Sequence, residues 1–398
     1  MRKEIQSLIA IVASHGAMHG YLVILPAVLP LMKEELGNYF ILGLLSSILY
    51  MVYGWGSFPV GLLADRFSKK KMIILSMALC GISSILISLS NGLLTAAFAF
   101  TLLGVGTCLY HPVGYSLISL LSEEKRGRYM GIQGLGGNIG MAMAFFISAI
   151  AGSLLGWRDT FLIWGIVGIA LSVINLLFVI ESSGGRISAD DNTGFSKQGI
   201  KENLARLKGE LNFLRTFFLI IFIVVISGML WSGVSSFLVA YINETKNATL
   251  VFAGGLATIS YTVGSFAQVI GGELSDKVGR RLIFLLGFGL FSLTLFLFTL
   301  PFNGGAILII IMVSSLGFLF FVTQSPLAAI VGDIFSQKRR GLGYGINFTV
   351  KYGVGGIAPG LAGYLTTKSI HLAFYFFALI SIVAFLLSFY LKENFIKN

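Results

Sequence analysis

The sequence predicts an all-α membrane protein with twelve transmembrane helices, arranged as two pseudo-symmetric halves of six. Three observations lead to this fold class: the composition, a series of long apolar runs and an internal repeat. Of the 398 residues, 56% are hydrophobic and only 11% are charged, whereas soluble proteins carry roughly 25% charged residues. With so few charges the chain cannot cover its surface in water, so we expect most of that surface to face lipid.

The apolar runs are long enough to cross a bilayer, which takes about 20 residues per helix. In the first half we expect spans at 5–31, 39–64, 72–90, 92–121, 128–154 and 157–180. In the second half we expect spans at 214–241, 250–275, 282–300, 304–333, 342–367 and 370–391. The predicted domains are therefore an N-terminal bundle over 1–180, a polar cytoplasmic linker over 181–213, and a C-terminal bundle over 214–398. Within the linker, the spacing of apolar residues from about Lys201 to Leu211 predicts a short surface helix.

The basic residues indicate the orientation of the chain. If the N-terminus lies inside, the inside segments carry most of the 28 Lys and Arg residues. The outside segments then carry only Lys33, Arg158, Lys246 and Lys368. Cytoplasmic loops are enriched in Lys and Arg, so the bias predicts a multi-pass protein of the plasma membrane with both termini in the cytoplasm. The same clusters explain the net charge of +11, so a nucleic-acid partner is not predicted.

Two stretches of the first half recur in the second. GLLADRFSKKKMI at 61–73 matches a segment that pairs Asp65 with Asp276, and 111–133 matches a segment that ends at Asn347. The longer match keeps one constant offset, and it pairs Pro112 with Pro326, Gly127 with Gly341, Gly131 with Gly345, and Gln133 with Asn347. Such a duplicated six-helix unit predicts a binding site near the membrane midplane, between the halves. It also makes a monomer the expected functional unit.

The loop sequence resembles the motif that joins the second and third helices of the major facilitator superfamily. The matching residues are Gly61, Asp65, Arg66 and 69–71, with a second copy at Asp276, Gly279, Arg280 and Arg281. The resemblance implies a transporter whose loop charges latch one conformational state. HGAMHGYLVILPAVLPLMKEELG near the start, with YHPVGYSL, KRG and GGNIG further on, is similar to the fosmidomycin-resistance branch. That similarity implies efflux of drugs by proton antiport.

Ionisable residues inside a membrane are costly, so they are candidates for function. Away from the ends of the predicted helices these are His15, His19, His111 and Lys351. His15 and His19 are four residues apart and therefore share a helix face. Histidine changes charge near neutral pH, so either it carries a coupling proton or it is a neutral, hydrogen-bonded core residue. A metal site is not predicted, because no third or fourth ligand is apparent beside this pair.

His111 precedes Pro112, and the proline predicts a bent or broken helix here and at Pro326. Lys351 is the sharpest candidate for a substrate contact. Either it lines a water-filled cavity, or it binds an anion, or it is neutral, or its stem reaches to the membrane edge. Further polar or aromatic residues are expected to line the cavity: Tyr110, Gln133, Asn138, Trp231, Gln324, Asn347 and Tyr352.

The leading hypothesis is a secondary transporter that works by alternating access and exports a small drug-like compound or metabolite against protons. The alternative within the same class is a transporter of a small organic anion, with Lys351 as counter-charge. A non-transporting receptor or scaffold is the alternative of another class. No catalytic set of residues and no nucleotide-binding loop is found, so neither an enzyme nor a cofactor is predicted.

Overall fold

The computed structural model describes residues 2–63, 67–122, 124–180, 211–301, 305–334 and 345–391. Within these residues the chain is helical and contains no strand. Eleven of its helices are long and apolar enough to cross a membrane. The remaining predicted span, 342–367, is an interrupted helix: residues 345–348, a π-helical segment η2 (Thr349–Val354), a 3₁₀ turn η3 (Gly355–Ile357) and α15 (Ala358–Thr366). The predicted fold class is confirmed.

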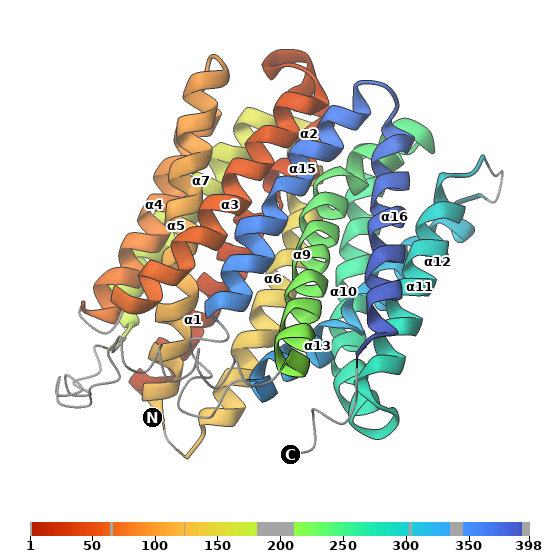
Figure 1. The fold of residues 1–398 in the computed structure, drawn as a ribbon. Coiled ribbons are helices and arrows are strands. Elements are labelled where there is room, and N and C mark those ends of the chain that lie inside the picture. The colour runs from red at the N-terminus through yellow and green to blue at the C-terminus, as the bar shows by residue number, and fades with distance from the viewer. Residues whose placement is uncertain are drawn as a thin grey trace.

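Each half contains six spans, and the halves stand side by side with both termini at the same end (Figure 1). In the first half, α4 packs on α5 and α7, and α1 packs on α6. Its elements are α1 (Arg2–Tyr21), α2 (Ile24–Leu36), α3 (Tyr39–Leu63), α4 (Lys69–Ser88), α5 (Leu93–Leu121), α6 (Arg126–Leu155) and α7 (Trp157–Phe178).

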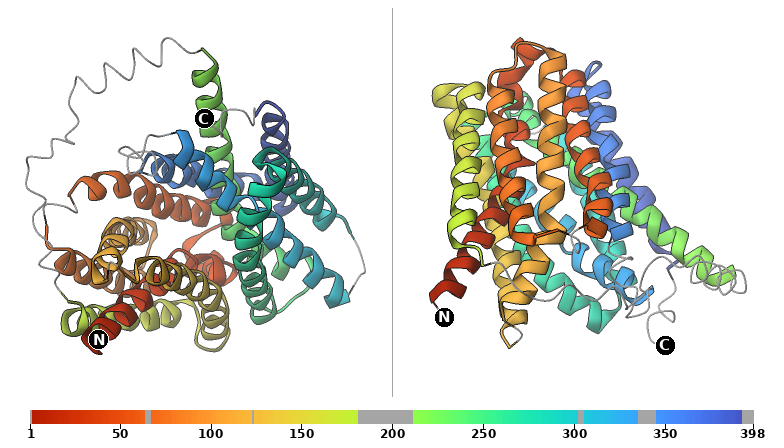
Figure 2. Two further views of the ribbon diagram at one scale, coloured as in Figure 1. Left: turned by 90° about the horizontal axis from the view of Figure 1, so that it is seen from below. Right: turned by 90° about the vertical axis from the view of Figure 1, so that its left-hand side faces the viewer.

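In the second half, α10 packs on α12, and α11 packs on α16. Besides the interrupted helix its elements are α9 (Leu211–Thr245), α10 (Leu250–Val278), α11 (Arg280–Thr299), α12 (Gly305–Phe321), α13 (Gln324–Ile334) and α16 (Ile370–Ser388). Seen along the bundle, the two sets of helices form two groups (Figure 2). Residues 181–210 of the predicted linker, with most of its predicted surface helix, lie outside the described residues, so the exact domain boundaries stay a prediction.

Two spans are broken close to a proline. A proline lacks the N–H that would bond to the carbonyl four residues earlier, but it fits the first turn of a helix. Pro26 and Pro326 both stand in the first turn of the helix that follows a break, α2 and α13. The carbonyl that Pro26 leaves free, on Leu22, accepts the Tyr50 hydroxyl at 2.9 Å. The corresponding carbonyl, on Val322, packs so closely on Gly271 that a Cβ there would lie 2.0 Å from it.

Of the bend or break expected at Pro112, the break is not found. α5 runs without interruption from Leu93 to Leu121 and contains Pro112. α3 packs directly on this turn, because a Cβ at Gly56 would lie 2.6 Å from the Cys108 sulfur. Membrane helices tolerate an interior proline where neighbouring helices support the turn, and this packing explains why α5 remains one helix.

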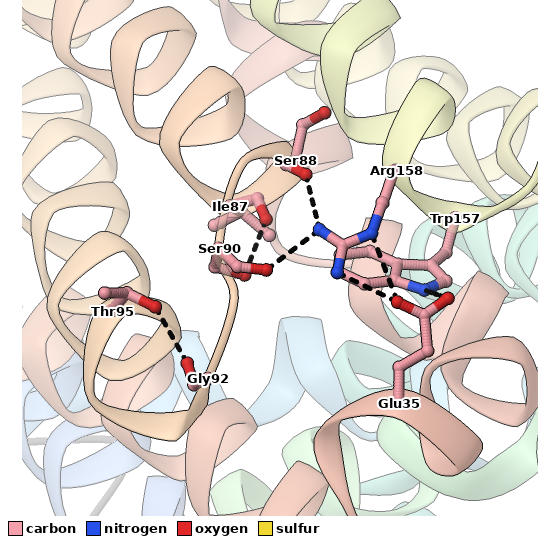
Figure 3. A network of polar contacts seen from close by, with 8 residues as sticks. All are labelled: Glu35, Ile87, Ser88, Ser90, Gly92, Thr95, Trp157 and Arg158. Carbon is pink, nitrogen blue, oxygen red and sulfur yellow. Dashed lines mark hydrogen bonds and ion pairs between the residues drawn. The ribbon is translucent and has the colours of Figure 1, made fainter.

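At the end opposite the termini, Arg158 at the start of α7 ties three helices of the first half together (Figure 3). Its guanidinium donates to Glu35 Oε2 of α2 at 2.9 and 3.1 Å. It also donates to the carbonyls of Ser88 and Ser90, at the end of α4, at 2.8 Å each. The neighbouring Trp157 indole donates to Glu35 Oε1 at 3.1 Å.

The halves meet through α3 against the interrupted helix, α6 against α10, and α2 against α9. α3 approaches so closely that a Cβ at Gly54 would lie 2.0 Å from the Gly353 nitrogen. Further toward the end opposite the termini, Lys33 of α2 forms an ion pair of 2.9 Å with Glu244 of α9. The Tyr39 hydroxyl donates to the same carboxylate at 2.5 Å. The halves are thus in contact from the middle of the bundle to this end.

Candidate functional site

Three histidines meet in the first half of the molecule. His15 and His19 lie one turn apart on α1, and α5, which packs on α1, brings His111 to them. The ring centroids are 4.7 Å apart for His15 and His19, and 5.2 Å apart for His111 and each of the other two. The sequence showed only the pair on one helix face, and the fold adds the third imidazole.

α6 supports this cluster from the side. The Gln133 carbonyl lies 2.7 Å from His15 Nδ1. Gly137, one turn further, leaves room for the rings, because a Cβ there would lie 2.6 Å from His15 and 3.0 Å from His19. The Tyr110 ring stacks on His15 at 5.3 Å, and its hydroxyl donates to the Ile11 carbonyl at 2.6 Å. Tyr110 and Gln133, both predicted to line the site, therefore lie beside the histidines and position them.

Most polar atoms of the cluster lack a partner. His15 and His111 are 2% and 6% exposed. His15 Nε2, His19 Nδ1 and both nitrogens of His111 are buried without a hydrogen bond, as are both side-chain polar atoms of Gln133. Buried polar groups are normally paired, and an unpaired one costs about 1–3 kcal/mol. So many unpaired atoms in one place make the cluster a candidate site.

In the second half, Lys351 lies in the π-helical segment, half-buried, and donates to Gln324 Oε1 at 2.7 Å. The amide nitrogen of Gln324 donates to the Phe320 carbonyl at 3.1 Å and to the Thr323 hydroxyl at 2.9 Å. At the break before α13 the Phe320 carbonyl also accepts from the N–H and the hydroxyl of Thr323. Because a carbonyl only accepts, it fixes which end of the Gln324 amide faces Lys351. The ammonium is therefore held inside the bundle and does not extend to the membrane edge.

No carboxylate pairs with Lys351 in the described part of the chain; the ion pairs found there lie elsewhere. The Lys351 ammonium instead lies 5.4 Å from the centroid of the Tyr352 ring. Trp231 of α9 contacts Tyr352 with ring centroids 5.3 Å apart, and it is buried. The site thus presents a cation and aromatic faces, with neutral amide and hydroxyl groups around them.

The histidines and Lys351 face the same boundary between the halves. Tyr53 of α3 contacts His111 at 5.8 Å and Tyr352 at 5.1 Å, measured between ring centroids. Phe348 contacts the same two rings at 5.2 and 5.3 Å. The Tyr53 hydroxyl is buried without a partner. Sequence reasoning missed Tyr53 and Phe348, since neither differs from the many other aromatic residues of the apolar runs.

The remaining predicted residues divide into two groups. Asn347 lies beside Phe348, with Oδ1 buried and unpartnered. Asn138 is half-buried on α6 and forms no hydrogen bond with the histidines or with Lys351.

Of the predicted latch, Asp65 and Arg66 lie outside the described residues, and Gly61 is exposed near the end of α3. Asp276 and Arg280 flank the turn between α10 and α11, where Gly279 has a φ of +92°. That backbone conformation favours glycine, and the latch itself stays a prediction.

Comparison with known proteins places this architecture among transporters. The sequence model of the Major Facilitator Superfamily matches residues 10–359 and, in a second match, 220–395. An uncharacterized MFS-type transporter of Bacillus subtilis, YfnC, is 24% identical over 92% of this chain and 88% of its own length. A probable sulfoacetate transporter of Cupriavidus necator, SauU, is 24% identical over 85% of this chain and 82% of its own length.

Two further similarities follow. The fosmidomycin resistance protein of Escherichia coli is 23% identical over 92% of this chain and 88% of its own length. The crystal structure of the nucleoside transporter NupG superposes with a TM-score of 0.78 over 98% of this chain and 100% of that chain, at 16% identity. The latter similarity concerns the fold alone.

Proposed function

The chain belongs to the Major Facilitator Superfamily, and on that premise we propose that it is a secondary transporter of a small organic anion, which Lys351 binds between the two halves. The observation that carries the proposal is the Lys351 ammonium, held by Gln324 at 2.7 Å and lacking a carboxylate among the described residues. An isolated ammonium at the centre of a membrane helix costs about 2.5 kcal/mol or more. An anionic substrate would balance this charge each time it binds.

The similarity to a probable sulfoacetate transporter supports an anion as substrate. We propose alternating access as the mechanism, because the candidate site lies where the two halves meet and the halves close on each other toward one end. In this mechanism the contacts at Lys33 and Glu244 separate when the site opens to that side.

We propose protons as the coupling ion on electrostatic grounds. Moving one elementary charge against the membrane potential costs about 2.3 kcal/mol per 100 mV. An anion that enters a cell with a negative interior meets this cost unless a cation travels with it, and a proton makes the movement neutral. The charge bias of the loops supports a plasma-membrane protein with both termini in the cytoplasm, and the duplicated half supports a monomer as the working unit.

A second candidate is proton-coupled export of a drug-like compound. The similarity to a fosmidomycin resistance protein over most of the chain supports it. Trp231, which contacts Tyr352, also lines a small apolar pocket with Tyr261, Phe291 and Phe320, so apolar surface lies close to the residues around Lys351. The two candidates differ in the direction of net flux and in whether the substrate must carry a negative charge.

The test is transport by purified protein in proteoliposomes. A panel of short carboxylates, sulfonates and phosphonates, with uncharged analogues of each, is screened under an imposed pH gradient of either sign, with and without a membrane potential. We expect flux for an anion and none for its uncharged analogue. Absence of flux for every anion would overturn the anion proposal, and flux that ignores the pH gradient would overturn proton coupling.

Lys351→Met tests the binding role directly. A hydrogen bond to a charged group contributes about 1.5–3 kcal/mol, so the variant is expected to lose about tenfold or more in apparent affinity for the anion. Lys368→Met is the matched control, since it removes the same charge from an exposed position beyond α15, and it should transport as the wild type does. Equal affinity of the two variants would remove Lys351 from the site.

A further inference from the structure

The three-histidine cluster has the composition of a metal centre. One ring nitrogen from each of His15, His19 and His111 lies within 4.8 Å of the others. Three nitrogens bound to one zinc at 2.0–2.1 Å with tetrahedral angles lie about 3.4 Å from one another. The rings therefore need to move by no more than about 1.5 Å to share an ion, which rotation of a histidine side chain provides.

The hydrogen bond from His15 fixes how this ring would bind. A carbonyl oxygen only accepts, so the contact of 2.7 Å to the Gln133 carbonyl requires that His15 Nδ1 carries the proton. In the neutral ring, which is the form that binds a metal, His15 Nε2 then has a free lone pair, and this atom is buried without a partner. A histidine that donates one ring N–H to a backbone carbonyl and directs the other nitrogen at a metal is the usual arrangement of ligating histidines.

The other two rings are not part of a satisfied core network. His19 Nδ1 and both nitrogens of His111 are buried and make no hydrogen bond, although the rings lie side by side. A cluster that served packing alone would be expected to pair these nitrogens with one another or with the backbone. Ligand atoms of three histidines that lie within 4.8 Å of one another, among nitrogens that lack a partner, are explained by a shared ligand that accepts their lone pairs.

We propose that His15, His19 and His111 form a binding site for a divalent transition-metal ion of the zinc type. Three imidazoles with no carboxylate suit Zn²⁺ and its neighbours Co²⁺, Ni²⁺ and Cu²⁺, whereas Mg²⁺ and Ca²⁺ require oxygen ligands. Three protein ligands leave the fourth tetrahedral position open to water or an anion. His111 contacts Tyr53 and Phe348 at the boundary between the halves, so the site borders the same region as Lys351. The site does not depend on what the protein transports.

Co²⁺ is the probe that reports the geometry. The full chain is purified in detergent with an affinity tag that contains no histidine, and it is titrated with Co²⁺ while visible absorption is recorded. We expect one Co²⁺ per chain with the intense absorption of a tetrahedral ion, which added Zn²⁺ abolishes by displacement. If the wild-type protein gives no more than the weak absorption of octahedral Co²⁺, or shows no saturable binding, that result alone overturns the proposal.

The chain provides a matched control in its fourth histidine. His371 lies at the start of α16, far from the cluster in sequence, and hydrogen-bonds to the Tyr241 hydroxyl at 2.8 Å. His371→Gln should bind Co²⁺ as the wild type does, whereas His111→Gln should lose about tenfold or more in affinity and the tetrahedral spectrum. A monodisperse elution profile of each variant shows that it is folded. Unchanged binding by His111→Gln, or equal loss in His371→Gln, would overturn the assignment of the ligands.

Discussion

Arg158 donates to two backbone carbonyls at the point where α2 and α4 end and α7 begins. The last carbonyls of a helix have no partner within it; Ser88 carries such a carbonyl at the end of α4, and Ser90 lies two residues beyond it. The planar guanidinium donates to both and to Glu35 at the same time (Figure 3). Lysine has the same charge but a single donor group with different geometry. The network therefore depends on the shape of the arginine side chain and not only on its charge.

Arg158→Lys is expected to destabilise the first half by about 1–2 kcal/mol, because about two hydrogen bonds to the helix end are lost. The measurement is the midpoint of thermal unfolding in detergent. Thr95→Val in the first turn of α5 is the matched control, since this exposed hydroxyl bonds only to the Gly92 carbonyl one turn away. It should change stability by less than about 0.5 kcal/mol. If both variants unfold together with the wild type, the network does not stabilise the fold.

Single residues also show how much of the candidate site could be predicted from the sequence. Lys351 and the histidines were predictable, because an ionisable group in an apolar run is conspicuous for its cost. The pairing of Lys351 with Gln324 was not, since it depends on the break before α13 and on a π-helical segment that no residue pattern indicates. The same holds for His111, which reaches His15 and His19 only through the packing of α5 on α1.

At the scale of elements, whether a helix breaks at a proline depends more on the neighbouring helices than on the proline itself. Pro26 and Pro326 stand in the first turn of a new helix, whereas Pro112 lies within a continuous one. The sequence shows the three prolines but not which carbonyls find other partners, as the Leu22 carbonyl does in Tyr50. Spans and the repeat were predictable because hydrophobic length and sequence identity are local properties, while breaks depend on neighbouring helices.

α3 and the interrupted helix approach at Gly54, where a Cβ would lie 2.0 Å from the Gly353 nitrogen. Gly54→Ala therefore forces these elements apart and should shift the population away from the state described here. Spin labels at positions 33 and 246, one in each half, are expected to report longer distances by double electron–electron resonance. Gly134→Ala on α6 is the control, because a Cβ there meets nothing within 4 Å. Identical distance distributions for both variants would show that this contact does not set the conformation.

At the scale of the whole molecule, the two halves differ in what they bring to their common boundary. The first half supplies Tyr53 and three imidazoles, most of whose nitrogens lack a partner, and the second supplies the Lys351 cation and its amide partner. A duplicated fold would place equivalent positions in symmetric locations, yet the chemistry on the two sides is different. In the proposed mechanism, a substrate between the halves therefore meets a distinct surface on each side, so a movement of one half against the other changes its set of contacts.

Such a movement requires that the halves separate at the end opposite the termini, where Lys33 pairs with Glu244 at 2.9 Å. Both side chains are partly exposed, and an exposed pair contributes only about 0.2–1 kcal/mol, so this contact can open and close during a transport cycle.

Lys33→Cys with Glu244→Cys, joined by a reducible bifunctional thiol reagent, is expected to stop anion flux, and reduction should restore it. The background carries Cys80→Ala and Cys108→Ala, which remove the two buried native thiols. Glu4→Cys with Lys125→Cys is the control, because this pair lies 3.9 Å apart within the first half and its cross-link should leave flux intact. Full flux through protein cross-linked between positions 33 and 244 would show that the halves need not part at this end, and alternating access by this movement would be wrong.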